Sequence, residues 1–585
     1  MNVEKPLLIY DGECGFCQRW VDRWRSVTQE RIDYAPFQEI GDRFPEIPRK
    51  ACEQSVHLIE PDGTILRAAE AVFRTLAYVP GYGWMLWLYR HLPGARPISE
   101  WVYQYVARHR NTPPRYFLTR SIFLKSLGVI YLIAFVSLWT QILGLVGSNG
   151  ILPAKGFLEA VAGRFGVARY WFLPTLCWFN ASDGFLQFLC AGGAFLSILL
   201  IVDIAPAPVL FFLWLFYLSL TTVCREFLSF QWDALLLETG FLAIFFAPLG
   251  LWPRASRESP PPPLVLWLLR LLLFKLMFGS GMVKLASGDP MWRHLTSLTF
   301  HYETQPLPTW VGWYAHQLPE WFQKLSTIVM FFMELIVPFS IFAPRRLRKI
   351  GCALLVVFQL LIMATGNYCF FNLLTLALCV LLLEDTVWPQ GPSPRCWPRW
   401  IVVPVASVMI SVSAFQLLGL FRVRSPWLFP VAVVQNILEP FRSLNRYGLF
   451  AVMTTSRPEI IVEGSNDGET WLAYEFKYKP GDLKRVPGFV APHQPRLDWQ
   501  MWFAALGTYR QNPWFMNFCN RLLQGSPEVL TLLANNPFPT SPPKYIRAAV
   551  YDYHFTDLKT KQREGAWWRR EERHLYCPIL TRREK

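Results

Sequence analysis

Two cysteines near the N-terminus have the spacing of a redox pair. Cys14 and Cys17 follow a short apolar strand, 6–10, and a turn, 11–13. We expect a helix to begin here, whose free N–H groups and dipole favour a thiolate at Cys14. Cys17, one turn later, can then resolve a mixed disulfide. The alternatives are two structural thiols or half of a zinc site, which needs four ligands.

Four charged residues lie inside long apolar segments, where a charge is costly and is usually functional or paired. They are Asp233, Glu238, Arg270 and Lys275. Glu238 and Lys275 are each about midway along their segments, so we expect them at similar depth and paired with each other. A structural ion pair and a catalytic one both remain open.

A third group of polar residues follows the segment that contains Lys275. Its members are Lys284, Asp289, Trp292, His301, Tyr302, Glu303, Gln305 and Pro306. A histidine close to a carboxylate can act as a base. The sequence has no HExxH or comparable zinc spacing, so we predict no metal site. Packed or surface roles for the histidines stay open beside a functional one.

Long apolar helices must position these residues. Of the 585 residues 52% are hydrophobic and 17% are charged, which excludes a disordered or fibrous chain. Several apolar segments reach the ~20 residues that span a bilayer core, which argues against an ordinary soluble enzyme. About nine spans are expected, at 122–146, 185–202, 209–223, 227–250, 264–283, 327–342, 350–365, 368–383 and 401–420.

The basic residues predict an orientation for these spans. The net charge is +15, and because no zinc-finger, RRM or KH signature is present we expect no nucleic-acid partner. Lys and Arg gather in cytoplasmic loops of membrane proteins, and the first span is preceded by Arg108, Arg110, Arg115 and Arg120. The N-terminus is therefore expected in the cytoplasm, without a cleavable signal peptide. With nine alternating spans, loops 254–257, 345–349 and 395–399 are also cytoplasmic.

This alternation places the C-terminal region and the loop 284–326 on the periplasmic or lumenal side. The chain then has three regions: residues 1–115, mixed α/β; 116–425, multi-span; and 426–585, a soluble α+β region. In the last we expect a β-hairpin around Asn466-Asp467-Gly468. Further helices are expected at 497–506 and 514–533, and strands at 545–553 and 572–578.

The cysteine pair lies in a recognisable sequence context. The run Tyr10-Asp11-Gly12-Glu13-Cys14-Gly15-Phe16-Cys17 resembles the DCC family of thiol-disulfide oxidoreductase-like proteins. The resemblance covers roughly the first 110 residues. It implies a thioredoxin-like α/β domain with Cys14 and Cys17 as the catalytic pair. A thioredoxin relative usually has a cis-proline before its third strand, and the corresponding Gln54-Ser55-Val56 holds no proline.

A second resemblance covers the chain from about residue 116 to its end. The segments 278–290 and 301–308 closely resemble the lipase maturation factor family. Further similar segments are 147–153, 230–233, 367–374, 445–450, 512–515, 536–538 and 567–570. The resemblance implies a protein, surrounded by membrane lipids, that assists maturation of an exported lipase-like client through its outer C-terminal domain. Vertebrate members lack the DCC-like domain, so we expect a bacterial inner-membrane homologue.

A more distant resemblance gives an alternative function. Gly281-Met282-Val283-Lys284, followed by Asp, Trp and Leu, is similar to the membrane domain of vitamin K-dependent carboxylases. It implies a membrane-embedded, quinone-using enzyme with Lys284 as the reactive group, Glu303 or His301 as its partner, and a quinol or lipid as cosubstrate. A DCC-type oxidoreductase that uses Cys14 and Cys17 is a third hypothesis. Apart from these cysteines and the quinone of the alternative, no cofactor is expected.

Overall fold

The computed structural model describes residues 3–40, 43–109, 116–252, 260–385, 397–421 and 426–582. The chain divides into two compact units, Met1–Pro114 and Arg115–Lys585. Five of the arginines that contribute to the predicted orientation lie outside the described residues; they are Arg110, Arg115, Arg254, Arg257 and Arg395.

The first unit is built on a four-stranded sheet with the order β2–β1–β3–β4. Strand β1 is parallel to β2 and antiparallel to β3, which is antiparallel to β4. The strands are β1 (Leu7–Tyr10), β2 (Asp33–Pro36), β3 (His57–Ile59) and β4 (Ile65–Arg67). The helices are α1 (Gly15–Thr28), α2 (Phe37–Ile40), α3 (Arg49–Gln54), α4 (Ala68–Ala77), α5 (Gly83–His91) and α6 (Ala95–His109). Leu8, Val21 and Leu58 join β1, α1 and β3 in one core.

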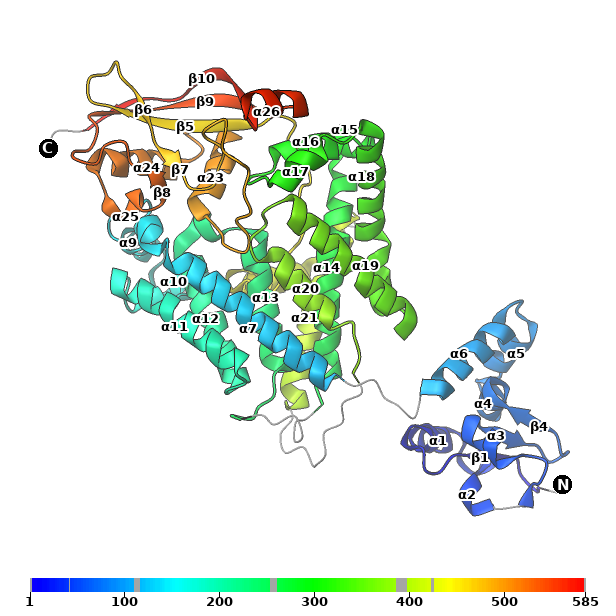
Figure 1. Ribbon diagram of the computed structural model, residues 1–585. Coiled ribbons are helices and arrows are strands. Elements are labelled where there is room, and N and C mark those ends of the chain that lie inside the picture. The colour runs from blue at the N-terminus through cyan, green and yellow to red at the C-terminus, as the bar shows by residue number, and fades with distance from the viewer. Residues whose placement is uncertain are drawn as a thin grey trace. The chain divides into compact units, whose positions relative to one another are not determined.

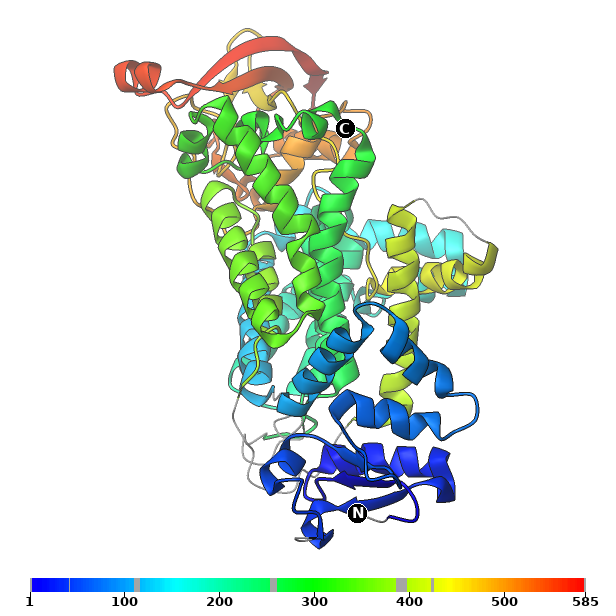
Figure 2. The same ribbon diagram turned by 90° about the vertical axis from the view of Figure 1, so that its right-hand side faces the viewer.

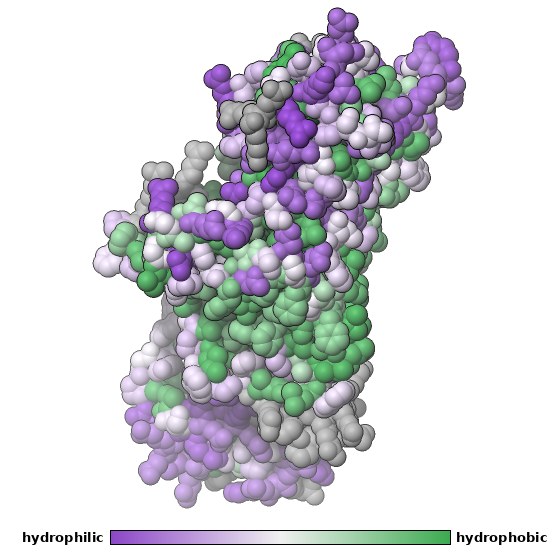
Figure 3. Space-filling model, turned by 90° about the vertical axis from the view of Figure 1, so that its left-hand side faces the viewer, coloured by the Kyte–Doolittle hydropathy of each residue, from purple (hydrophilic) through white to green (hydrophobic). Residues whose placement is uncertain are grey.

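The second unit contains the membrane helices. Within its described residues, seven helical segments are long and apolar enough to cross a membrane. They contain α7 (Phe117–Trp139), α11 (Asp183–Ile201), α12 (Pro206–Cys224), α14 (Pro263–Ser287), α18 (Glu320–Leu335), α19 (Arg345–Thr365) and α21 (Arg399–Leu420). Figure 3 shows an apolar surface over part of this helical region, consistent with lipid-facing side chains.

The other two predicted spans form shorter helices. The expected span 227–250 is reduced to α13 (Gln231–Phe246), because a 3₁₀ turn occupies Arg225–Leu228 and the chain becomes extended at Ala247, the C-cap residue. The expected span 368–383 is reduced to α20 (Phe371–Val380). Most side chains of both helices are buried against neighbouring helices.

Short helices connect the long ones or follow the last of them. They are α8 (Ile142–Val146), α9 (Ala154–Phe165), α10 (Arg169–Phe172), α15 (Pro290–Arg293), α16 (Ser297–Thr304), α17 (Trp310–His316) and α22 (Phe429–Leu438). Helices α15, α16 and α17 lie at the end of the bundle that carries the C-terminal strands (Figures 1 and 2).

The C-terminal region, which we call the C-terminal module (residues 443–582), forms a sheet with the order β10–β9–β5–β6. Its strands are β5 (Pro458–Ser465), β6 (Leu472–Ala473), β9 (Tyr545–Phe555) and β10 (Trp568–Thr581), with β7 (Glu475–Phe476) and β8 (Leu533–Asn535) in a separate pair. The predicted hairpin is confirmed by the antiparallel pairing of β5 with β6. The helices are α23 (Arg496–Ala505), α24 (Pro513–Gln524), α25 (Pro527–Leu530) and α26 (Leu558–Glu564).

The predicted helix 514–533 is interrupted. It ends at Gln524 because Gly525 adopts a φ of +68°, the left-handed conformation that closes many helices. Pro527 then starts α25. The module and the membrane helices share one hydrophobic core, in which the rings of Phe227 and Trp514 lie 5.8 Å apart.

Candidate functional site

The cysteine pair lies at the start of α1. Cys14 is the N-cap residue, and its Sγ accepts a hydrogen bond from the backbone N–H of Cys17 at 3.4 Å. The Cys17 thiol donates to the same sulfur at 2.9 Å. Both side chains are only 5% exposed. The two sulfurs are therefore adjacent, and Cys14 is the one that receives both hydrogen bonds.

The turn before Cys14 is held tightly. The N–H of Gly12 donates to the Gln38 side chain at 2.9 Å, and Gln38 donates to Asp11 at 2.8 Å. A Cβ on Gly12 would lie 2.6 Å from Cβ of Pro36, which closes β2. Glycine is required at position 12 because the turn passes directly against Pro36. This turn then positions Cys14.

The predicted Glu238–Lys275 pair is present and forms part of a larger network. Lys275 Nζ lies 3.0 Å from Glu238 Oε1. The other oxygen, Oε2, accepts hydrogen bonds from the Tyr447 hydroxyl at 2.7 Å and the Asn445 backbone N–H at 2.8 Å. Both carboxylate oxygens are thus used within the protein. The network attaches the start of the C-terminal module to α13 and α14.

Asp233 forms a second buried network with a partner that was not predicted from the sequence. Arg496 donates to both Asp233 oxygens, at 2.6 and 2.8 Å, and Tyr217 donates to Oδ1 at 2.5 Å. Burial alone lowers the pKa of Arg496, but the Asp233 carboxylate raises it above the ordinary value. This bidentate pair joins α13 to α23 of the module. The available signal was an arginine immediately before the predicted helix 497–506.

Arg270 has a different environment. Its guanidinium donates to the backbone carbonyl of Leu381 at 2.9 and 3.1 Å and to the hydroxyl of Tyr116 at 3.2 Å. Leu381 follows the last residue of α20, where a cation is favoured by the unpaired carbonyls and the helix dipole. Arg270 therefore caps the C-terminal end of α20.

The polar residues of 284–306 separate into two groups. Asp289 caps α15 through Met291 N–H at 2.9 Å and also accepts the N–H of Met453 at 2.6 Å. Glu303 accepts the N–H of Phe555 at 2.7 Å and lies 3.1 Å from Nδ1 of His554. These two carboxylates therefore bind the C-terminal module rather than a shared reaction centre.

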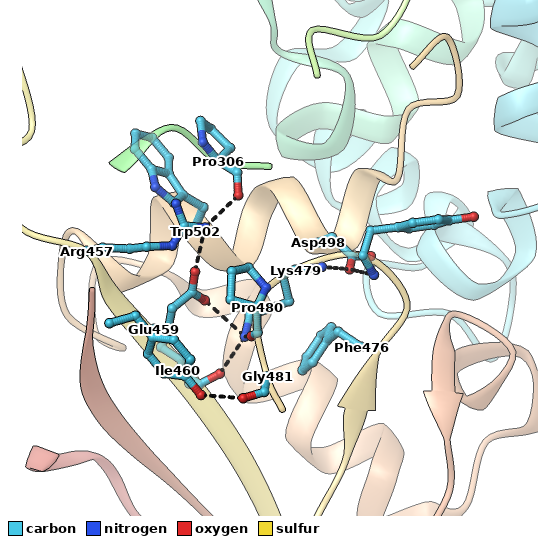
Figure 4. A network of polar contacts seen from close by, with 12 residues as sticks. Pro306, Arg457, Glu459, Ile460, Phe476, Lys479, Pro480, Gly481, Asp498 and Trp502 are labelled. Carbon is cyan, nitrogen blue, oxygen red and sulfur yellow. Dashed lines mark hydrogen bonds and ion pairs between the residues drawn. The ribbon is translucent and has the colours of Figure 1, made fainter. Parts of the chain in front are cut away.

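Arg457 completes this contact (Figure 4). It is fully buried and donates to the backbone carbonyls of Glu303, at 2.6 Å, of Gln305, and of Pro306, at 2.9 Å. Glu459 pairs with Arg457 at 2.8 Å and with Lys479 at 3.0 Å. Burial lowers the pKa of Arg457, whereas Glu459 acts in the opposite direction.

The second group lines a cavity of about 470 Å³ between membrane helices. Its members are Lys284, Trp292, His301 and Tyr302. Lys284 Nζ donates to both carboxylate oxygens of Glu334, at 2.9 and 2.8 Å, and lies 5.5 Å from the ring centre of Trp292. Glu334 was not among the residues predicted from the sequence, although an acid inside the predicted span 327–342 was a visible signal.

The expected alternative catalytic grouping is assembled only in part. Lys284 and His301 line the same cavity, but the partner of Lys284 is Glu334, and Glu303 binds the module instead. The described residues contain no group of three or more His, Cys, Asp or Glu that could hold a metal ion.

Known families match all three regions of the chain. The model of the lipase maturation factor transmembrane domain matches residues 118–390, and that of the lipase maturation factor C-terminal domain matches residues 443–578. The chain belongs to the lipase maturation factor family. A DCC1-like thiol-disulfide oxidoreductase model matches residues 8–115, the region of the cysteine pair.

Individual relatives align with most of this chain. Lipase maturation factor 2 of Xenopus tropicalis is 38% identical over 79% of this chain and 82% of the relative. Human lipase maturation factor 2 is 36% identical over 79% and 83%. Mouse lipase maturation factor 1 is 36% identical over 80% and 87%. No solved structure matches the chain.

Proposed function

We propose that this lipase maturation factor homologue assists the maturation of an exported lipase-like client, which the C-terminal module contacts outside the cytoplasm. The observation that carries the proposal is the family match over both the membrane region and the module. The buried networks of Arg496, Arg457 and Glu238 support it, because they fix the module to the membrane helices. A client bound there is thus presented at a fixed position above the bilayer.

We also propose nine membrane crossings of a bacterial inner membrane, with the N-terminus in the cytoplasm and the module on the periplasmic side, which is equivalent to the ER lumen. Asp289 and Glu303 contact the module, so their loop and the module share one side. The number of crossings between them must therefore be even. The long helices α18, α19 and α21 give three, so α20 supplies the fourth. The same parity argument counts α13, because Ser137, at the end of α7, contacts the module at Gln494.

For the N-terminal unit we propose a thioredoxin-like fold and dithiol–disulfide exchange. The strand order, the parallel β1–β2 pair and the cysteines at the start of α1 support this fold. Cys14 thiolate attacks a substrate disulfide and expels one substrate thiolate, forming a mixed disulfide. Cys17 then attacks Cys14, releasing the reduced substrate and leaving a Cys14–Cys17 disulfide. The substrate gains two electrons and the cysteine pair loses two.

The maturation function is tested in the host cell. Deleting the gene is expected to lower the activity of secreted lipase per amount of lipase antigen, and the full chain is expected to restore it. Arg496→Met, which loosens the module, should restore less than Arg547→Met, which removes a partly exposed ion pair with Glu463. The amount of each variant in the membrane is measured in parallel. An unchanged lipase activity per antigen after deletion overturns the proposal.

A further inference from the structure

The cavity next to Lys284 is open to the surroundings of the membrane helices. Lining residues come from helices α14 to α20 and from Leu449 and Phe450 of the module, and most are apolar. Four of them, on α18 and α19, are themselves exposed: Phe322 by 39%, Leu325 by 49%, Val329 by 45% and Leu361 by 60%. Because α18 and α19 are membrane-spanning segments, a lipid chain can enter from the bilayer. The volume of about 470 Å³ lies within the usual range for small-molecule pockets, ~300–1,000 Å³.

The charges in the cavity wall favour a neutral occupant. Apart from His301, the acidic and basic side chains among the described lining residues are Lys284 and Glu334, and they form a bidentate ion pair. Lys284 is 3% and Glu334 7% exposed. An anionic headgroup would have to compete with Glu334 for Lys284, and a cationic one with Lys284 for Glu334. Either exchange leaves a buried charge without its partner, which is strongly unfavourable.

A chain of hydrogen bonds determines which ring nitrogen carries the proton in His301, another lining residue. Gln305 donates through Nε2 to the backbone carbonyls of Tyr302 and Thr365, so its Oε1 is the acceptor for the Tyr368 hydroxyl at 3.0 Å. The single hydroxyl proton of Tyr368 is then used. The 3.1 Å contact of this hydroxyl with His301 Nε2 therefore requires Nε2 to be the donor.

The other ring nitrogen of His301 is consequently a hydrogen-bond acceptor. Burial, assisted by the charge of Lys284, lowers the pKa of His301 to about 4, so the ring is neutral at pH 7. Neutral imidazole protonated on Nε2 carries a lone pair on Nδ1. A ligand that bonds this nitrogen must supply an O–H or N–H. A quinone in its oxidised form offers only acceptor oxygens and does not meet this requirement.

We propose that the cavity binds a neutral lipid with a free hydroxyl group, of which diacylglycerol is the test case, with the hydroxyl donating to His301 Nδ1 and a hydrocarbon chain along the apolar wall. The Tyr302 hydroxyl, which also lines the cavity, can accept or donate a second bond. The ligand thus enters from the bilayer and becomes part of the membrane region close to the module.

The test uses the full chain in lipid nanodiscs and a diacylglycerol with a photoactivatable group on one acyl chain. Labelled peptides are expected from α18 and α19. Leu361→Trp, at the cavity opening, should lower labelling by about tenfold, equivalent to ~1.4 kcal/mol of binding. Leu360→Trp is the matched control, because Leu360 is its neighbour, is 51% exposed and does not line the cavity. Equal labelling of the two variants overturns the site.

Competition identifies the headgroup. Unlabelled diacylglycerol should reduce labelling at a concentration about tenfold lower than phosphatidylglycerol or an oxidised quinone of similar chain length. This ratio corresponds to ~1.4 kcal/mol, near the upper end of the contribution of one neutral hydrogen bond. His301→Phe should remove this preference while the apolar chain still binds. Stronger competition by phosphatidylglycerol or by the quinone, or an unchanged preference in a folded His301→Phe protein, overturns the assignment of a hydroxyl lipid. Folding is checked by thermal unfolding of each variant.

Discussion

The Asp233–Arg496 pair allows a quantitative test of how the module is attached. Both side chains are almost completely buried, at 0% and 1% exposure. In Arg496→Met, Asp233 keeps the Tyr217 hydroxyl as a partner but loses both charged donors. Removing one member of a buried ion pair typically costs about 3–5 kcal/mol, because the remaining charge is left in a poorly solvated site. We expect a loss of this size in the free energy of unfolding.

The measurement is a denaturant titration in detergent followed by tryptophan fluorescence. Asp233→Asn is the second arm of a double-mutant cycle, since it removes the charge but keeps the side-chain size. The double variant should lose at least ~1 kcal/mol less than the sum of the single losses. Arg547→Met, at a partly exposed pair, should cost at most about 1 kcal/mol. Single losses that add to within ~0.5 kcal/mol would refute the argued coupling.

Three further predictions concern thiols and protonation. With a disulfide-bonded test substrate, Cys17→Ser should accumulate a mixed disulfide at Cys14, seen by non-reducing gel, and Cys14→Ser should not. Cys519 and Cys577 are buried and hydrogen-bonded to each other, so in an oxidising compartment they should become a disulfide that blocks alkylation after denaturation; two free thiols would contradict the proposed side of the module. Burial lowers the pKa of His493 from 6.5 to about 4, so stability should fall as the pH decreases from about 6.5 towards 4, and a melting temperature with the same pH dependence in His493→Gln would disprove this origin.

Local sequence patterns were sufficient for the hairpin of the module and for one ion pair. Alternation and turn residues predicted the hairpin, and equal depth in adjacent spans predicted the contact of Glu238 with Lys275. The partner of Asp233 was not predictable in this way. Arg496 is more than two hundred residues away, and only the docking of α23 on the helices brings it to the carboxylate. Such contacts depend on tertiary packing, which leaves no periodic pattern in the local sequence.

The residues between Lys284 and Pro306 illustrate the same distinction. Their polarity in an apolar surrounding suggested chemistry, yet Asp289 and Glu303 satisfy backbone N–H groups of the module. A buried backbone donor without a partner is costly, so a carboxylate at such a contact serves stability. Lys284 and His301 instead line a cavity. Sequence spacing could not separate the two groups, because neighbouring residues of α16 belong to different ones: Tyr302 lines the cavity, and Glu303 accepts a hydrogen bond from the module.

The two short helices show why hydropathy length is a poor guide inside this bundle. A helix that faces lipid must extend over the hydrocarbon core, since its last carbonyls and N–H groups find no partners there. Helices α13 and α20 are mainly surrounded by protein, and polar groups reach their ends: Arg270 binds the carbonyl of Leu381 after α20, and Gln231 at the start of α13 exchanges hydrogen bonds with Gly448. At these positions contacts with protein groups satisfy the helix ends, so these helices can be shorter than a lipid-facing helix. Replacing Arg270 should therefore destabilise α20 more than removing a polar contact at the end of a full-length, lipid-facing helix would destabilise that helix.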